Sequence, residues 1–249
     1  MKFLYNQTEI SRTRTFCYQY NNNSFRIVKV KKCRLPGFEL LSKALDENIN
    51  PRDEIERISL SRTKKNIREL ALCNDFEYFA TLTVDKNYCD RYDIDICQAS
   101  LKKLFKAYKR KNKNFAYLFI TEKHKDAAFH FHGLVKGMNV EDLYNNQNNY
   151  LSNKFFDCLG FNSFSVIRDY EKTCNYITKY ITKDCVRNKT RQIYISSRGL
   201  LKAFKTEIQN FDDNTFFTFE NDYCFVRDFK LSDLNISQLC DLTQKIVDK

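Results

Sequence analysis

The spacing of apolar residues changes repeatedly between residues 76 and 202, and this pattern constrains the fold more than any other feature. Alternating apolar and polar residues predict five β-strands, at residues 77–84, 115–122, 129–136, 161–168 and 192–196. Apolar residues at helical spacing predict helices at 94–111 and 171–186, with a variable helical piece ending near Gly160. The resulting βαββαβ order predicts an α+β fold, a ferredoxin-like or split βαβ antiparallel sheet with helices on one face.

The segments on either side of this unit predict additions to it. Residues 13–35 alternate weakly around three consecutive asparagines, which predicts two strands joined by a turn. Apolar residues recur at helical spacing within 62–73, where basic side chains fill most other positions. Towards the other end, Asn221 and Asp222 predict the turn of a hairpin, and a last helix is expected from about Ser232.

The chain is strongly basic, with a formal net charge of +11 from 42 Lys and Arg against 31 Asp and Glu. Basic residues cluster on two predicted helices, at Arg62, Lys64, Lys65 and Arg68 and at Lys102, Lys106, Lys109 and Arg110. Neutralising phosphates with such side chains releases condensed counterions, so a nucleic acid partner is favoured. A solvated lysine-rich helix face would carry the same charge.

Cysteines and apolar runs exclude several classes of protein. Ten cysteines occur without any Cys-x-x-Cys pair, which argues against a zinc ribbon. Residues 1–10 lack the apolar core of a signal peptide, and no run of roughly 18 apolar residues is found. We therefore expect reduced thiols, a cytoplasmic location and no membrane partner.

Two histidines alternate along one predicted strand, in the sequence Phe129-His130-Phe131-His132. Strand alternation places both imidazoles on one face and both phenyl rings on the other. A hairpin turn around residues 124–127 would bring Glu122 opposite His130. Two histidines and one carboxylate leave coordination positions open, which suits Mg²⁺ or Mn²⁺ more than a closed zinc site. Chance placement of two histidines is the alternative, and His124 is expected at the surface.

Two tyrosines lie one helical turn apart in the predicted helix 171–186. Tyr176, Lys179, Tyr180 and Lys183 follow one stripe beside a buried stripe of apolar residues, so both phenols can point into one cleft. A phenol with a pKa of about 10 needs help to act as a nucleophile, which nearby ammonium groups and a metal can supply. Attack on DNA would give a phosphotyrosine ester and a free 3′ hydroxyl. Amphipathic rings packed at the rim of a core would show the same pattern.

These motifs together resemble those of the HUH endonucleases. His130-Phe131-His132 resembles the His-hydrophobic-His motif, and Tyr176-x-x-x-Tyr180 with Lys179 and Lys183 resembles the two-tyrosine motif. Residues 79–85 are similar to the first-strand motif of the replication initiators in this superfamily. The segments at residues 120–126, 165–169 and 196–200 further resemble rolling-circle initiators of phages and mobile elements of low-GC Gram-positive bacteria.

The resemblance covers about residues 60–202 and implies roles for individual residues. Tyr176 and Tyr180 would be the nucleophiles that cut at initiation and at termination, assisted by Lys179 and Lys183. His130 and His132 would bind the metal, with Glu122 as third ligand. Arg168 and Arg198, in the similar segments, join the basic helices as expected DNA-binding residues. The implied substrate is single-stranded or hairpin origin DNA in a bacterial host cytoplasm, with host helicase and polymerase as partners.

On this basis the chain is divided into three parts. Residues 1–73 are expected to be a basic hairpin and helix that position DNA, 74–202 the nickase domain, and 203–249 a hairpin and helix packed on the core. Two alternatives stay open. One is a mobilisation relaxase or single-strand transposase with the same chemistry. The other is a non-catalytic DNA-binding protein whose basic helices hold phosphates while aromatic side chains stack on bases.

Overall fold

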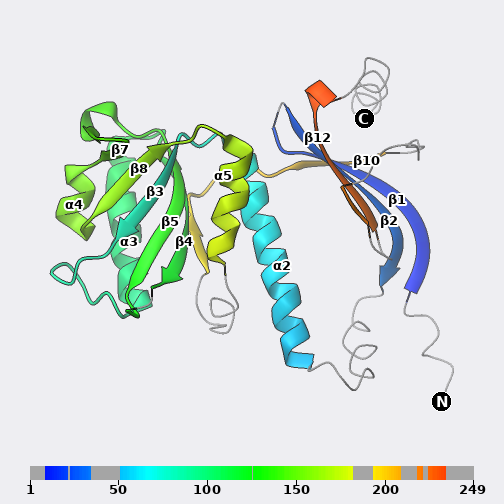
Figure 1. Cartoon of the computed structure of the whole chain (residues 1–249), viewed down its shortest axis with the longest axis horizontal. Coiled ribbons are helices and arrows are strands. Elements are labelled where there is room, and N and C mark those ends of the chain that lie inside the picture. The colour runs from blue at the N-terminus through cyan, green and yellow to red at the C-terminus, as the bar shows by residue number, and fades with distance from the viewer. Residues whose placement is uncertain are drawn as a thin grey trace. The chain divides into compact units, whose positions relative to one another are not determined.

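The structure is a computed structural model that describes residues 9–21, 23–34, 51–124, 126–181, 193–208, 218–220 and 224–233. The chain divides into two compact units. The larger unit is Glu56–Leu201, and the smaller combines Met1–Ile55 with Lys202–Lys249. Figure 1 shows the elements of both units. None of the described helices is long and apolar enough to cross a membrane.

A seven-stranded sheet forms the centre of the larger unit, with the order β6-β7-β8-β3-β5-β4-β9. Every pair of neighbouring strands is antiparallel. The strands are β3 (Tyr78–Thr83), β4 (Ala116–Lys123), β5 (Phe129–Lys136), β6 (Tyr144–Asn146), β7 (Asn149–Leu151), β8 (Asn162–Val166) and β9 (Tyr194–Ser196). The predicted α+β class with an antiparallel sheet is confirmed.

One face of this sheet is covered by α3 (Ile94–Lys111) and α4 (Asn153–Leu159). Helix α3 begins where the Asp93 side chain accepts hydrogen bonds from two backbone amides, as expected of an N-cap. Its apolar stripe packs on alternate residues of the central strands, among them Leu82, Phe119 and Phe131. The shared core explains why apolar residues alternate along these strands in the sequence.

The opposite face carries a second helical layer, as Figure 1 also shows. Helix α5 (Tyr170–Tyr176) continues into the 3₁₀ helix η2 (Ile177–Tyr180), whose aromatic rings contact this face. The last turns of α2 (Pro51–Leu72) pack beside α5, since the Tyr170 hydroxyl donates to the Ala71 carbonyl at 2.6 Å and Arg68 donates to Asn175. The tyrosines are therefore carried by a layer separate from α3.

The structure differs from the predicted elements in two places. The expected helical piece before Gly160 contains the short 3₁₀ helix η1 (Val140–Asp142), the β6–β7 hairpin and only then α4. The expected helix at 171–186 is α-helical only as far as Tyr176 and 3₁₀ as far as Tyr180. Its second half, including Lys183, lies outside the described residues.

The smaller unit is a five-stranded sheet with the order β10-β1-β2-β12-β11. It comprises β1 (Glu9–Gln19), β2 (Ser24–Arg34), β10 (Phe204–Ile208), β11 (Phe219–Glu220) and β12 (Cys224–Lys230), followed by the 3₁₀ turn η3 (Leu231–Asp233). A small core of Cys17, Phe25, Ile27, Ile208 and Phe229 holds it together. The grouping differs from the three expected segments, because the first hairpin pairs with strands from the last part of the chain while most of α2 belongs to the larger unit. The turn at 221–223 and the helix expected beyond Asp233 lie outside the described residues.

Candidate active site

The two histidines lie on β5 in the middle of the larger sheet, between β3 and β4. Glu122 pairs with His130 across the β4–β5 hairpin, which is the register expected from the sequence. The carboxylate nevertheless reaches diagonally, and its Oε2 lies 2.8 Å from Nε2 of His132. The turn that sets this register closes without glycine, since Ala127 adopts a left-handed φ of 68°. All three side chains therefore share one face of the sheet.

Two threonines on β3 hold the other nitrogen of each imidazole. Thr81 Oγ1 lies 3.2 Å from Nδ1 of His132, and Thr83 Oγ1 lies 3.2 Å from Nδ1 of His130. A hydroxyl can donate or accept, so it serves either tautomer of the ring. With Nδ1 held in this way, Nε2 of each ring is the nitrogen that faces a possible ligand.

Burial keeps both imidazoles neutral at neutral pH. It lowers the pKa of His130 and of His132 below the ordinary histidine value, more than the neighbouring Glu122 carboxylate raises it. Neutral imidazole is the form that binds metal ions. The electrostatic environment of the pair is therefore compatible with metal ligation.

Both tyrosines lie over the same face. The Tyr180 ring stacks on the His132 ring, with centroids 4.0 Å apart and an interplanar angle of 12°. Phe79 on β3 contacts both tyrosine rings, at 5.7 Å and 6.4 Å between centroids. The Tyr180 hydroxyl donates to the Tyr176 hydroxyl at 2.8 Å. The histidines and both phenols thus line one site, which is the arrangement that the sequence motifs require.

The two phenols differ in their surroundings. The Tyr176 side chain is 43% exposed, whereas Tyr180 is partly covered by His132 and Phe79. Burial raises the pKa of Tyr180 above the ordinary tyrosine value, and the hydrogen bond to Tyr176 raises it further. Lys179 Nζ lies 5.2 Å from the centre of the Tyr176 ring, close enough for a cation–π contact. Tyr176 is therefore the more accessible phenol and Tyr180 the more protected one.

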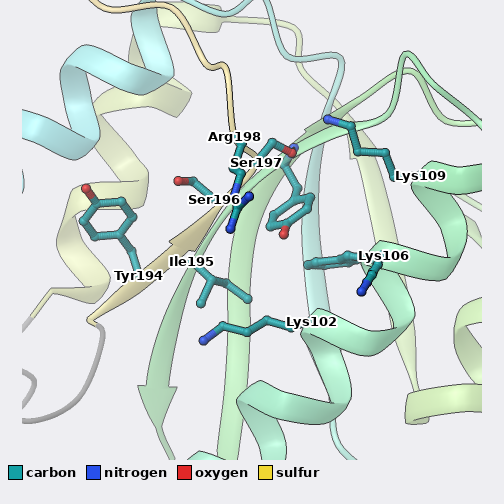
Figure 2. A pocket seen from close by; sticks show the side chains of 10 residues that line it. Lys102, Lys106, Lys109, Tyr194, Ile195, Ser196, Ser197 and Arg198 are labelled. Carbon is teal, nitrogen blue, oxygen red and sulfur yellow. The ribbon is translucent and has the colours of Figure 1, made fainter.

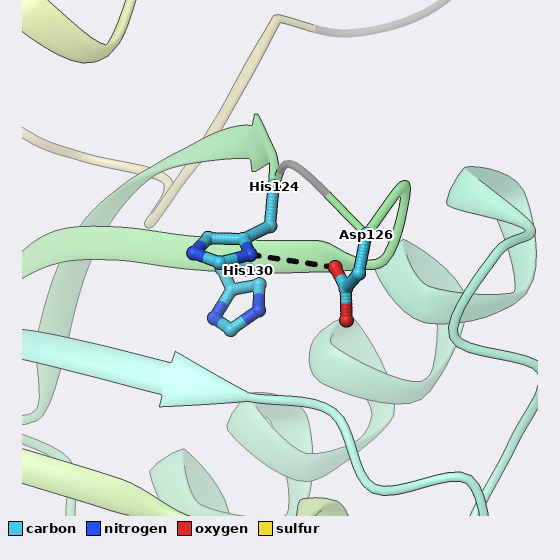
Figure 3. A group of neighbouring side chains, drawn as sticks. All are labelled: His124, Asp126 and His130. Atoms are coloured by element: carbon cyan, nitrogen blue, oxygen red, sulfur yellow. Dashed lines mark ion pairs between the residues drawn. The ribbon is translucent and has the colours of Figure 1, made fainter.

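A second group of possible metal ligands shares His130. Ligand atoms of His124, Asp126 and His130 all lie within 4.8 Å of one another (Figure 3). Sequence reasoning placed His124 at the surface, where it is indeed exposed, and did not single out Asp126. The Asp126 carboxylate is already engaged by Arg91 at 2.8 Å and by the Ala128 amide, and this amide is the main cause of its lowered pKa. Competition from Arg91 makes this group a weaker cation site than one formed with Glu122.

The expected DNA-binding residues fall into separate groups. Lys102, Lys106, Lys109 and Arg198 line one pocket beside α3. Arg168 lines a different, amide-rich pocket with Asn145 and Gln147. Arg62, Lys64, Lys65 and Arg68 lie on α2, and Arg110 is exposed on α3. The structure does not bring them together into a single surface patch.

Thr81 and Thr83 are the residues of the site whose role sequence reasoning missed. Their alternation along a strand repeats that of His130 and His132, which was the available signal. Only the β3–β5 register, which pairs Thr81 with His132 and Thr83 with His130, shows that they face the imidazoles.

Comparison with known proteins gives one match. Residues 77–185 match the family model of the replication-associated protein ORF2. Neither the curated proteins nor the solved structures gave a match. The matched segment is less than half of the chain, yet it contains the histidines, Glu122, both tyrosines and both threonines. Over this segment the chain is similar to replication-associated proteins, and the match supports a protein of the replication-initiator type.

Proposed function

We propose that this protein cuts and rejoins one DNA strand at an origin through a tyrosine ester, and so initiates rolling-circle replication. The observation that carries the proposal is the meeting of two motifs from distant parts of the sequence. The Tyr180 ring stacks on His132, and its hydroxyl bonds to that of Tyr176. One phosphodiester bound over β5 can therefore contact an imidazole-bound cation and a phenol together. The family match favours replication over transfer or transposition.

The residues of the site fit a divalent cation. Nε2 of His130, Nε2 of His132 and the Glu122 carboxylate are the donors that would hold it, and the threonine hydroxyls orient both rings. Two nitrogens and one carboxylate leave positions for phosphate oxygens, which favours Mg²⁺ or Mn²⁺. When bound, the cation would withdraw charge from the phosphate and so ease attack on it.

The covalent step is an exchange of one ester for another. The phenol oxygen of Tyr176 forms a bond to phosphorus, and the bond from phosphorus to the 3′ oxygen breaks. The phenol proton is lost, and the departing 3′ oxygen gains one, so the products are a 5′-phosphotyrosine and a free 3′ hydroxyl. No high-energy cofactor is consumed, and the reverse attack by a 3′ hydroxyl rejoins the strand.

The geometry supports different first roles for the two tyrosines. Tyr176 is accessible and receives the hydrogen bond, so charge that develops on its oxygen is stabilised by the Tyr180 hydroxyl. Lys179, beside the Tyr176 ring, adds positive charge near the attacked phosphate. Tyr180 keeps its proton and acts first as a donor. After Tyr176 is esterified, Tyr180 remains one helical turn away as a second nucleophile for termination.

Covalent capture of DNA tests this proposal. The protein is incubated with single-stranded oligonucleotides of the replicon's origin in Mn²⁺ or Mg²⁺, and adducts are separated on a denaturing gel. We expect a metal-dependent adduct that is lost in the double variant Tyr176→Phe/Tyr180→Phe. Tyr88→Phe is the matched control, because this exposed tyrosine lies outside the site and the adduct should persist. An adduct that survives the double variant would refute tyrosine attachment.

The ligand set is tested separately from the nucleophile. Glu122→Gln keeps the shape of the side chain but removes the charge, so Mn²⁺ affinity and adduct yield should both fall at least about tenfold. Asp126→Asn removes one charge of the alternative group and should change both by less than about twofold. The opposite result, with Asp126→Asn the more harmful change, would place the cation between His124 and His130.

A further inference from the structure

A basic pocket lies between α3 and the edge strand β9, away from the histidines. Its volume is about 640 Å³, within the range that accommodates a nucleotide-sized group. Figure 2 shows Lys102, Lys106 and Lys109 reaching from α3, with Arg198 facing them from the segment after β9. The floor is formed by apolar and aromatic side chains, including Tyr117. The lining includes no acidic residue.

The cations of this pocket are not used by the fold. Within the described part of the chain, Lys106, Lys109 and Arg198 form no salt bridge, although exposed acidic residues are plentiful. Lys102, Lys106 and Lys109 are spaced four and three residues apart on one side of α3, where like charges destabilise a helix. Such a cluster becomes favourable once an anion occupies the space between α3 and Arg198.

The pocket is continuous with the candidate active site through the sheet. His132 pairs with Ile120 on β4, and Ile120 pairs with Tyr194 on β9. Two strand spacings of about 4.8 Å separate His132 from Tyr194, so the edge of the sheet is roughly 10 Å from the imidazole. Figure 2 shows Tyr194 pointing away from α3, towards the face that carries the histidines. A DNA strand that crosses this edge would pass from the histidine face into the basic pocket.

We propose that the pocket is a second DNA subsite, in which Lys106, Lys109 and Arg198 bind backbone phosphates of the strand beside the nick. This inference rests on the proposed function and adds where the bound strand leaves the active site. The occupant is a phosphodiester chain, because the lysines are solvent-accessible point charges along a helix side. The pocket contains neither a glycine-rich loop nor a helix N-terminus that would enclose the phosphates of a free nucleotide.

A comparison of two double variants on the same helix tests the subsite. Lys106→Gln/Lys109→Gln removes two charges from the pocket, and Lys103→Gln/Arg110→Gln removes two exposed charges that do not line it. Binding of a labelled single-stranded DNA of mixed sequence is measured by fluorescence anisotropy over a range of salt concentrations. The slope of log K against log salt should decrease in magnitude by about 0.7 for each phosphate that is no longer neutralised. For two such phosphates, binding near 0.1 M salt weakens about 20-fold, whereas the control pair should change it by less than about threefold.

Charge reversal and competition sharpen the test. Arg198→Glu should weaken DNA binding more than Arg110→Glu, with both variants folded by circular dichroism. Equal losses for pocket and control variants would show diffuse attraction and overturn the subsite. Displacement of the DNA by a mononucleotide, abolished in Lys106→Gln/Lys109→Gln, would assign the pocket to free nucleotides and overturn it as well.

The outcome is separable from that of the proposed function. If the pocket variants bind DNA as the controls do while the Tyr176-dependent adduct still forms, the subsite fails and the nickase stands. If no adduct forms with any origin DNA while the pocket variants still lose affinity, the nickase fails and the basic pocket stands as a nucleic acid site.

Discussion

The smallest decisive feature is the pair of hydroxyls on β3 that hold the histidine rings. Replacing both with Thr81→Val/Thr83→Val preserves side-chain shape but removes the partners of both Nδ1 atoms. We expect Mn²⁺ affinity to fall about 10-fold to 100-fold, because ligand orientation is lost while the ligands remain. Isothermal titration calorimetry measures the affinity. Thr81→Ser/Thr83→Ser, which restores the hydroxyls, should recover most of it, and unchanged affinity in the valine variant would deny the threonines this role.

The hydrogen bond between the phenols predicts a shift in pH dependence. The raised pKa of Tyr180 means that it keeps its proton, and remains a donor, as the pH rises past the ordinary tyrosine value. Tyr180→Phe removes the donor, so more alkaline solution is needed to reach the same rate of attack by Tyr176. The pH profile of first-turnover adduct formation should move upward by about one unit. A profile that stays in place or moves to lower pH would show that the hydrogen bond does not assist the attacking oxygen.

Sequence alone predicted the members of the site better than their partners. Strand alternation placed His130 and His132 on one face, and the hairpin placed Glu122 opposite His130, as found. Alternation cannot tell which neighbour a long side chain reaches, and Glu122 turns diagonally to His132. Stacking of Tyr180 on His132 was also out of reach, because it depends on how η2 lies over the sheet.

At the scale of elements, the β4–β5 hairpin depends on a glycine directly after His132. A Cβ atom on Gly133 would lie 2.3 Å from Cδ1 of Phe119 and 2.6 Å from the Leu118 carbonyl oxygen. Phe119 is fully buried in the core and cannot move aside without disturbing other packing. Gly133→Ala should therefore lower the free energy of unfolding by about 3 kcal/mol or more, measured by urea denaturation.

A second glycine separates crowding from backbone strain in this experiment. Gly199 has a φ of 81° but nothing within 4 Å of its added Cβ, so Gly199→Ala should cost only about 1–2 kcal/mol. A smaller loss for Gly133→Ala than for Gly199→Ala would contradict the close approach of Phe119 to β5.

The elements that sequence patterns missed are those with few buried residues. The strands β6 and β7 are rich in asparagine and partly or fully exposed, so they lack the alternation that marks a strand. Gln147, with a φ of 58°, turns the chain between them, although glutamine is no recognised signal for a turn. In contrast, α3 combines an aspartate N-cap with a complete apolar stripe, and its bounds were predicted to the residue. Patterns specify elements only where burial imposes a period.

For the whole molecule, the sequence could not show that distant strands share a sheet. The β12 strand pairs with β2 about two hundred residues earlier, and Arg26 and Asp228 meet there at 2.6 Å. Pairing at this separation depends on side-chain fit between strands, which local periodicity does not encode. All the candidate catalytic and metal-binding residues lie in the other unit, Glu56–Leu201.

That division predicts that stability and chemistry can be separated. Ile27 is 1% exposed in the core of the smaller sheet, so Ile27→Ala should cost that unit about 2–5 kcal/mol while adduct formation per folded molecule stays unchanged. Leu82→Ala makes a comparable cavity between Thr81 and Thr83 and should reduce both stability and adduct yield. Since the chain has no tryptophan, hydrogen exchange with mass spectrometry should follow the two units separately. Loss of the adduct in Ile27→Ala, with the larger unit still protected, would mean that the smaller sheet contributes directly to the reaction.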